Sequence, residues 1–368
     1  MTLPAGTCPG KALMRMTAVA AALLAIAVAA GGCRGGKDAA NATAAGREKK
    51  LNIYIWSSYM PQDVLDDFTK QTGIAVHYDL YDSNEQVLDK LQSAAADYDL
   101  VVPSDYMVRI LIHRNLIKPI IKGRLQGLSG LDPRFLNRGF DPANRYSVPY
   151  VWGTTGFGYN KERVKGAVDS WAPLFDPANR GQILMLDDMR ECFSVALKQL
   201  GESINTRDPE VLKRAAELLK KQKPLVKTYS SRDFDKALAA GDVTYAHGYS
   251  GQLARVTAAN PGRFAYVVPK EGATIWIDSV CIPTRARHTD SIYAFLNFIL
   301  DAKVNARIIN AIRYASGNGA ALTWIDPAIT HDPAVYTTED ALARCELAED
   351  IGEATELMEK YWTEIRAE

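Results

Sequence analysis

The stretch that decides the fold is Ala273-Thr274-Ile275-Trp276-Ile277-Asp278-Ser279-Val280-Cys281-Ile282-Pro283. Its aliphatic run predicts a buried β-strand, and Pro283 ends it because proline cannot donate to a sheet ladder. Side chains alternate along a strand, so Trp276 and Asp278 point the same way. An ionised carboxylate in apolar surroundings needs a positive or hydrogen-bonding partner. The stretch therefore predicts either an Asp that is satisfied by backbone amides beside a core Trp, or a cation site with an aromatic wall.

Around this strand, the composition is that of a globular chain. It has 368 residues, 43 basic against 43 acidic side chains, and 47% hydrophobic residues. This length predicts two domains rather than one. The balanced charge argues against a nucleic-acid partner, which would require a basic surface.

The N-terminus has the features of an export signal. Lys11 and Arg15 precede a continuous apolar, Ala-rich run over 17–30, which is too short for a comfortable membrane span. Residues 1–32 are therefore interpreted as a signal peptide. The small residues before Cys33 resemble a bacterial lipoprotein cleavage site, although Ala30 departs from the usual Leu, and they predict lipidation of Cys33; a plain soluble export signal is the alternative. Residues 33–50 are interpreted as a flexible tether.

The remaining cysteines do not indicate a metal site or a disulfide framework. Cys192, Cys281 and Cys345 are scattered, without the spacing of metal ligands, and at most one pair of them can form. The chain has neither a P-loop nor a Gly-rich dinucleotide fingerprint. We therefore expect no cofactor and no metal.

The order of predicted elements indicates an α/β fold. Strands and helices alternate from Leu51 to Asn115, which predicts a largely parallel sheet with helices on both faces. Further on, 147–150 and 155–159 are strand-like, with a break at 152–154. Two α/β modules, between which the chain crosses more than once, would form a hinged pair with a ligand in the crevice beyond the strand ends.

An acidic helix start follows the strand predicted at 182–186. Asp188 and Glu191 are three residues apart and share a helix face, close to the favourable N-terminal dipole. This pattern fits a solvated acidic helix start or, if it faces the crevice, a site for an ammonium group. The two acids are too close, and too alike in environment, to act as a separate acid and base on a glycosidic bond.

Aromatic and hydroxyl side chains recur where other predicted strands end. They occur in Trp56-Ser57-Ser58-Tyr59, in Pro103-Ser104-Asp105-Tyr106 and at Tyr314. Each motif alone is weak. Carboxylates together with aromatic faces suit a thin, flexible, multiply charged cation, whose methylenes pack on rings and whose amines contact acids.

The chain resembles a known family, the periplasmic polyamine-binding proteins of spermidine/putrescine ABC transporters, and most of all their spermidine-type members. The resemblance spans Leu51 to about Arg366. It is carried by five blocks in order: Tyr81-Asp82-Ser83-Asn84-Glu85, Tyr98-Asp99-Leu100-Val101-Val102-Pro103-Ser104, Pro149-Tyr150-Val151-Trp152-Gly153, Asp187-Asp188-Met189-Arg190-Glu191 and Ile275-Trp276-Ile277-Asp278-Ser279.

The resemblance implies a two-lobed periplasmic-binding-protein fold with the ligand between the lobes. It implies an N-terminal lobe of 51–151 plus 279–322 and a C-terminal lobe of 152–278 plus 323–368, with the hinge at 279–283. It also implies a ligand site: Asp188 and Glu191 would hold one ammonium, Asp278 another, and Trp276 would pack on the aliphatic chain. The remaining implied ligand residues are Trp56, Ser57, Tyr59, Ser104, Tyr106, His247 and Tyr314.

Three positions depart from the family pattern. Ser58 stands where the spermidine-binding member has Glu, His247 where a Trp stacks on the ligand, and Ala348, in a loose alignment, where a Gln contacts it. A histidine can become cationic near neutral pH, which would oppose an ammonium ligand.

The function expected from the resemblance is that of a monomeric, membrane-tethered subunit in the periplasm of a Gram-negative bacterium. It would capture a polyamine and deliver it to the permease of an ABC importer, without catalysis. A binder of another organic cation or small solute, a sensor subunit and an enzyme are the alternatives.

Overall fold

The computed structural model describes residues 49–93 and 96–367, which belong to one compact unit. The predicted signal peptide, Cys33 and the tether up to residue 48 lie outside the described residues.

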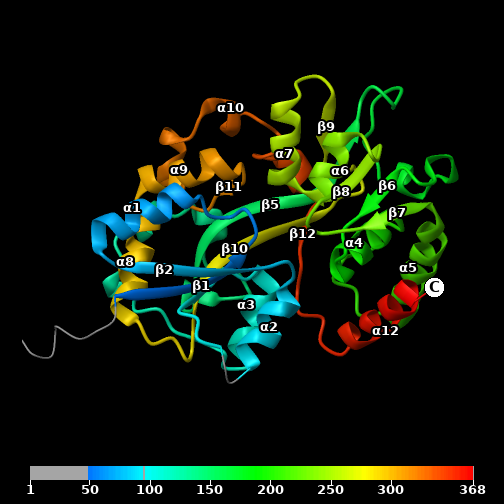
Figure 1. Ribbon diagram of the computed structural model, residues 1–368. Coiled ribbons are helices and arrows are strands. Elements are labelled where there is room, and N and C mark those ends of the chain that lie inside the picture. Colours follow the sequence, from blue (N-terminus) through cyan, green and yellow to red (C-terminus); the bar gives the residue numbers. More distant parts are fainter. Residues whose placement is uncertain (1–48, 94–95, 368) are drawn as a thin grey trace, which may run out of the picture. The chain divides into compact units, whose positions relative to one another are not determined.

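Eight strands form the main path of a single sheet, in the order β2-β1-β3-β10-β5-β8-β6-β7 (Figure 1). Their bounds are β1 Lys50–Trp56, β2 Ala75–Tyr81, β3 Leu100–Val101, β5 Ser147–Asn160, β6 Ile183–Met185, β7 Val226–Tyr229, β8 Tyr245–Tyr249 and β10 Thr274–Pro283. Four shorter strands attach to β5 and β10, namely β4 Ile117–Lys118, β9 Phe264–Val267, β11 Ala315–Ser316 and β12 Glu346–Leu347.

The two ends of the sheet are parallel and its middle is antiparallel. β1 pairs in parallel with β2 and β3, and β6 pairs in parallel with β7 and β8. β10 and β5 lie between these groups and run antiparallel to each other. The parallel sheet predicted for residues 51–115 is confirmed by the pairing of β1 with β2 and β3. The antiparallel strands β5 and β10 lie outside that range and run through both halves of the fold (Figure 1).

β5 is one unbroken strand of 14 residues, so the predicted break at 152–154 is wrong. The signal for a break was Gly153, which instead lies inside the strand. A Cβ at Gly153 would come within 2.6 Å of the Trp276 ring and 2.7 Å of the Ser250 hydroxyl. Glycine is needed here because a neighbouring side chain packs directly on the backbone, not because the chain turns.

Helices cover the sheet. Their bounds are α1 Gln62–Thr72, α2 Asn84–Gln92, α3 Asp105–His113, α4 Met189–Gln199, α5 Pro209–Gln222, α6 Phe234–Ala240, α7 Ser250–Ala259, α8 Thr289–Leu300, α9 Ala302–Ile312, α10 Pro327–Thr330, α11 Glu339–Leu342 and α12 Ala354–Ala367. Local capping residues fix the ends of two of these helices. Gly73 ends α1 with φ 68°, and the Ser83 side chain accepts a hydrogen bond from the Gln86 amide at the start of α2.

The buried apolar side chains gather in two large clusters. One lies between β1, β5, β10 and the helices α1, α8 and α9, and the other between β6 and the helices α4, α5 and α12. β5 contributes to both clusters, with Trp152 in the first and Phe157 in the second. The register of β10 against β5 shifts between Asp278 and Ser279, where Tyr150 of β5 is the extra residue. Such a β-bulge bends a strand and re-aims a side chain. The bulge therefore falls opposite the carboxylate that the sequence singles out.

Candidate ligand-binding site

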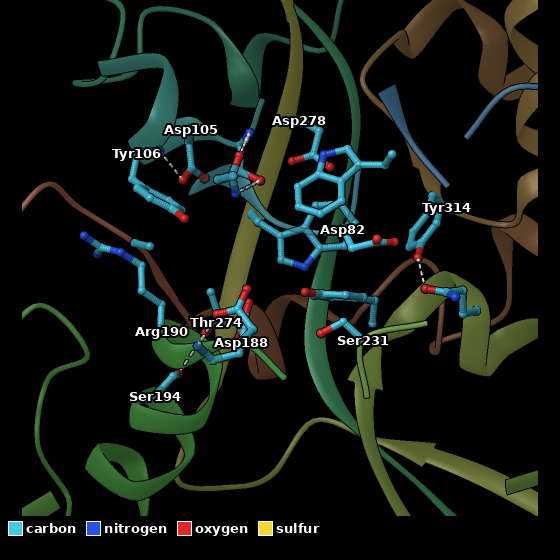
Figure 2. A pocket seen from close by; sticks show the side chains of 18 of the residues that line it. Asp82, Asp105, Tyr106, Asp188, Arg190, Ser194, Ser231, Thr274, Asp278 and Tyr314 are labelled. Atoms are coloured by element: carbon cyan, nitrogen blue, oxygen red, sulfur yellow. Dashed lines mark hydrogen bonds between the residues drawn. The ribbon is translucent and has the colours of Figure 1, made fainter. Parts of the chain in front are cut away.

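One pocket is lined by residues at strand ends and helix starts from both halves of the sheet (Figure 2). Its empty volume is about 890 Å³, including the open mouth. Every predicted ligand residue except His247 lines it: Trp56, Ser57, Tyr59, Ser104, Tyr106, Asp188, Glu191, Trp276, Asp278 and Tyr314. In the view of Figure 2, Asp278 lies at one end and Asp188 at the other, with Tyr106 and Tyr314 on opposite sides.

Asp278 is buried in β10 opposite the bulge of β5, with 2% of its surface exposed. Its Oδ2 accepts a hydrogen bond of 2.6 Å from the Tyr59 hydroxyl. Its Oδ1 is also buried and has no hydrogen-bond partner among the described residues. Burial raises the pKa of Asp278 to about 7, although hydrogen bonds from Ser104 and Tyr59 oppose the shift. The side chain therefore has one oxygen held by a hydrogen bond and one buried oxygen without a partner among the described residues.

Asp105, which sequence reasoning quoted but did not assign to the site, lies beside Asp278. Its two carboxylate oxygens accept backbone amides, Oδ1 from Tyr106 at 2.6 Å and Oδ2 from Ile277 at 3.1 Å. Burial nevertheless raises the pKa of Asp105 to about 8. Because both oxygens are occupied, Asp105 positions β10 against the start of α3, whereas Asp278 has an oxygen available for a ligand.

The second anionic centre is the start of α4. Asp188 caps the helix by accepting the Glu191 amide at 3.0 Å. Glu191 accepts the Thr155 hydroxyl at 2.9 Å on Oε1, while its buried Oε2 has no partner in the part of the chain that the structure describes. Burial raises the pKa of both acids, and the negative charge of Asp188 raises the pKa of Glu191 further. The predicted acidic helix start is therefore not a solvated face but part of the pocket.

Aromatic rings form the wall between the two anionic centres. Trp276 is 6% exposed and lies edge-on to Tyr314 and Tyr249, with ring centroids 5.4 and 6.2 Å apart. The indole Nε1 of Trp276 donates to the Thr155 hydroxyl at 3.2 Å, and that hydroxyl donates to Glu191. This chain of hydrogen bonds fixes the ring relative to the carboxylate.

The opposite wall is built from the start of α3 and the end of β1. Ser104 exchanges two hydrogen bonds of 3.1 Å with Asn84, and the Tyr106 hydroxyl donates to Glu85 at 3.2 Å. Trp56 lies 6.4 Å from Tyr59, and Tyr59 lies 5.1 Å from Tyr314, measured between ring centroids. These contacts order the aromatic and hydroxyl groups around the pocket.

His247 does not line the pocket, and its expected role is corrected. It is fully buried beside Trp171, with ring centroids 5.7 Å apart, and its Nδ1 accepts the Leu186 amide at 3.4 Å. Burial lowers the pKa of His247 to about 3, so the ring is neutral and does not oppose a cation. Tyr249, two residues later at the end of β8, is the aromatic residue that faces the site.

Several lining residues were missed by sequence reasoning. They are Asp82, Asn84, Asp105, Arg190, Ser194, Ile204, Ser231, Tyr249, Gln252, Thr274 and Met358. The Arg190 guanidinium lies 4.4 Å from the centre of the Tyr106 ring and donates to the Glu349 carbonyl and the Thr355 hydroxyl. Ala348 also lines the pocket, at the position compared with a ligand-contacting Gln. Ser58 is not among the lining residues and has a left-handed φ of 63°.

Comparison with known proteins identifies the family. A profile of bacterial extracellular solute-binding proteins matches residues 63–337. The chain belongs to this family.

Its relatives include the spermidine/putrescine-binding periplasmic protein of Salmonella typhimurium, which is 36% identical over 92% of this chain and 97% of its own length. Two solved structures are similar over nearly the whole fold. The Tp0655 lipoprotein of Treponema pallidum has a TM-score of 0.78 and 30% identity, over 87% of this chain and 100% of that chain. The spermidine/putrescine ABC transporter substrate-binding protein of Streptococcus pneumoniae has a TM-score of 0.74 and 30% identity, over 86% and 98%.

These findings confirm the resemblance to polyamine-binding proteins and the two-lobed α/β fold. The named relatives are binding proteins of transporters rather than enzymes. Cys192, Cys281 and Cys345 are free thiols. Within residues 49–93 and 96–367, no three His, Cys, Asp or Glu side chains converge as metal ligands. Over the same ranges, no helix is long and apolar enough to span a bilayer.

Proposed function

We propose that this protein is the extracytoplasmic substrate-binding subunit of an ABC importer and that its ligand is a polyamine. The observation that carries the proposal is a pair of buried carboxylate oxygens, Oδ1 of Asp278 and Oε2 of Glu191, that have no partner among the described residues and belong to a pocket that Trp276 also lines. A buried acceptor without a partner costs about 1–3 kcal/mol, more if it is charged, and an ammonium group would remove that cost. The aromatic wall suits the methylenes between two amines.

The ligand class is tested by calorimetric titration of the mature domain with spermidine, putrescine, an amino acid and a sugar. We expect binding of at least one polyamine at micromolar concentration or below, and no measurable heat of binding with the sugar. If neither polyamine binds more tightly than millimolar, the polyamine proposal is wrong. Another organic cation of similar shape is then the next candidate, because the same carboxylates and rings would serve it.

Enzymatic use of Asp188 and Glu191 is disfavoured by the geometry of α4. Asp188 is committed to capping the helix through the Glu191 amide, and burial raises the pKa of both acids in the same direction. A general acid and base need environments that push their pKa values apart. Binding without chemical conversion is therefore the simpler role, and recovery of unchanged polyamine after prolonged incubation checks it.

We infer that the exported protein is tethered to the membrane by a lipid on Cys33 and acts as a monomer in the periplasm. The support is the sequence at 17–33 and the similarity to a protein named as a lipoprotein in Treponema pallidum. Cys33→Ala is expected to move the protein from the membrane fraction to the soluble fraction. Retention of the variant in the membrane fraction would exclude an anchor on Cys33.

We further propose that ligand capture closes two lobes about the segment 279–283. The lobes would comprise 51–151 plus 279–322 and 152–278 plus 323–368. The support is the register shift between Asp278 and Ser279 and the presence of two separate apolar clusters, to both of which β5 contributes. A carboxylate at such a junction would contact the ligand where the lobes meet, so ligand charge would favour closure.

A further inference from the structure

Asp82 is a further carboxylate that lines the pocket, and it already has a cationic partner. Asp82 follows β2, and its Oδ2 accepts two hydrogen bonds from the guanidinium of Arg232, one of them from Nε at 2.7 Å. Both donors reach the same oxygen, and such charge-assisted hydrogen bonds are stronger than neutral ones. Arg232 therefore balances the charge of Asp82, whereas Asp278 and Glu191 each keep a buried oxygen without a partner among the described residues.

The contact joins distant parts of the chain at the rim of the pocket. Asp82 and Arg232 are 150 residues apart, and the Arg232 side chain is 71% exposed against 15% for Asp82. Ser231, the residue before Arg232, lines the pocket itself and has a buried hydroxyl without a partner in the described chain. In the view of Figure 2, Asp82 and Ser231 lie on the Tyr314 side, away from Arg190. The loop before α6 thus places Arg232 at the mouth, where a long ligand would emerge.

This arrangement sets how many amines the pocket can neutralise. One ammonium fits the centre at Asp188 and Glu191, and one fits Asp278. Each oxygen of Asp105 already accepts a backbone amide. A third ammonium would have to pair with Asp82, whose Oδ2 the Arg232 guanidinium contacts and whose charge it balances.

We propose that Arg232 is a specificity-determining residue that makes the site favour a diamine over a triamine by occupying Asp82. The proposal deepens the polyamine function proposed above and rests on it. Arg232 acts through Asp82 and does not itself need to touch the ligand.

The test is the ratio of dissociation constants for putrescine and spermidine, measured by calorimetry on the mature protein and on Arg232→Gln. The wild-type protein is expected to bind putrescine at least as tightly as spermidine. In Arg232→Gln, the affinity for spermidine relative to putrescine should rise about three- to tenfold, a modest effect because the contact is exposed and screened. The change should be smaller at high salt.

Lys236→Gln is the matched control. Lys236 is an equally exposed cation on α6, and its partner Asp233 lies one helical turn away rather than across the pocket. The control should change the ratio by less than about twofold. Asp82→Asn combined with Arg232→Gln should abolish the gain for spermidine, because the freed carboxylate is then gone.

The inference is wrong if the wild-type protein binds spermidine more tightly than putrescine, or if the ratio of dissociation constants is unchanged in Arg232→Gln. It is also wrong if Arg232→Gln lowers the affinity for both polyamines equally, because the ion pair would then stabilise the bound protein whichever ligand it holds. Failure of the wild-type protein to bind either polyamine would instead refute the proposed function. The two failures are therefore distinguishable in a single set of titrations.

Discussion

At the scale of single residues, Asp278 has one oxygen bonded to the Tyr59 hydroxyl and one buried oxygen without a partner among the described residues. Asp278→Asn keeps the size of the side chain and an acceptor for the Tyr59 hydroxyl, but removes the charge. We expect a folded protein whose polyamine affinity falls at least about tenfold, because a hydrogen bond to a charged group contributes about 1.5–3 kcal/mol. Calorimetric titration gives the affinity, and thermal melting followed by circular dichroism gives the fold. Unchanged affinity in the folded variant would remove Asp278 from the site.

The raised pKa values at the pocket make binding depend on pH. The pKa of Asp278 is about 7, raised by burial, and burial also raises the pKa of Glu191. An ammonium ligand prefers the ionised carboxylates, so capture near neutral pH should release protons, and affinity should rise between about pH 6 and 8. Titrations in buffers of different ionisation enthalpy count the protons. Identical heats in all buffers would show that the carboxylates are already ionised in the free protein.

The raised pKa of Asp278 makes the stability of the ligand-free protein fall as the pH rises, whereas ligand affinity rises with pH. A carboxyl group whose pKa is raised in the folded state binds more protons there than in the unfolded chain. Its contribution to stability is present below its unfolded pKa of about 4 and is lost as the pH rises through 7. Melting temperatures between pH 5 and 8 should therefore fall more steeply with pH for the ligand-free wild type than for Asp278→Asn.

At the scale of elements, α7 supports the aromatic wall through a glycine. A Cβ at Gly251 would lie 2.4 Å from Cδ1 of Tyr314, which in turn packs against Trp276. Although Ala usually favours a helix over Gly by about 1 kcal/mol, Gly251→Ala should lower both the melting temperature and polyamine affinity by displacing Tyr314. Gly123→Ala is the control, because a Cβ there meets nothing within 4 Å. Equal behaviour of the two variants would contradict the role assigned to α7.

Local signals in the sequence predicted most elements correctly, whereas pairings between distant elements were not predictable in the same way. Caps such as Ser83 and Asp188 fix helix starts through hydrogen bonds to nearby amides. The antiparallel contact of β5 with β10 joins residues more than a hundred positions apart, and no local pattern encodes it. Gly153 was misread because its role depends on Trp276, which lies far along the chain.

The candidate site was predictable where carboxylates, aromatic rings and hydroxyls recurred at the ends of predicted strands. Asp188, Glu191 and Asp278 stood out as acids at the ends of apolar runs or within them, and the structure brings them into one pocket. His247 was assigned by analogy rather than by chemistry, and Tyr249 lines the pocket instead. Asp82 carried no separate signal, because its importance comes from a partner 150 residues away.

At the scale of the whole molecule, the proposed hinge predicts a change of shape on binding. If the lobes close around a polyamine, the radius of gyration from small-angle X-ray scattering should decrease when the ligand is saturating. The decrease should be absent in Asp278→Asn at the same ligand concentration, because that variant leaves the site largely empty. A radius that does not change in the wild type would favour a pocket that is closed before the ligand arrives.

The free thiols have a practical consequence, because two of them lie close in sequence to the acids of the pocket. Cys192 directly follows Glu191, and Cys281 lies three residues after Asp278; both are buried, and burial raises the pKa of each well above its usual value. A thiol in this state reacts with an alkylating reagent only when the structure around it opens. The rates at which Cys192 and Cys281 are alkylated in the native protein therefore measure how often the structure opens locally. Cys192 reports opening around α4, and Cys281 reports opening around β10.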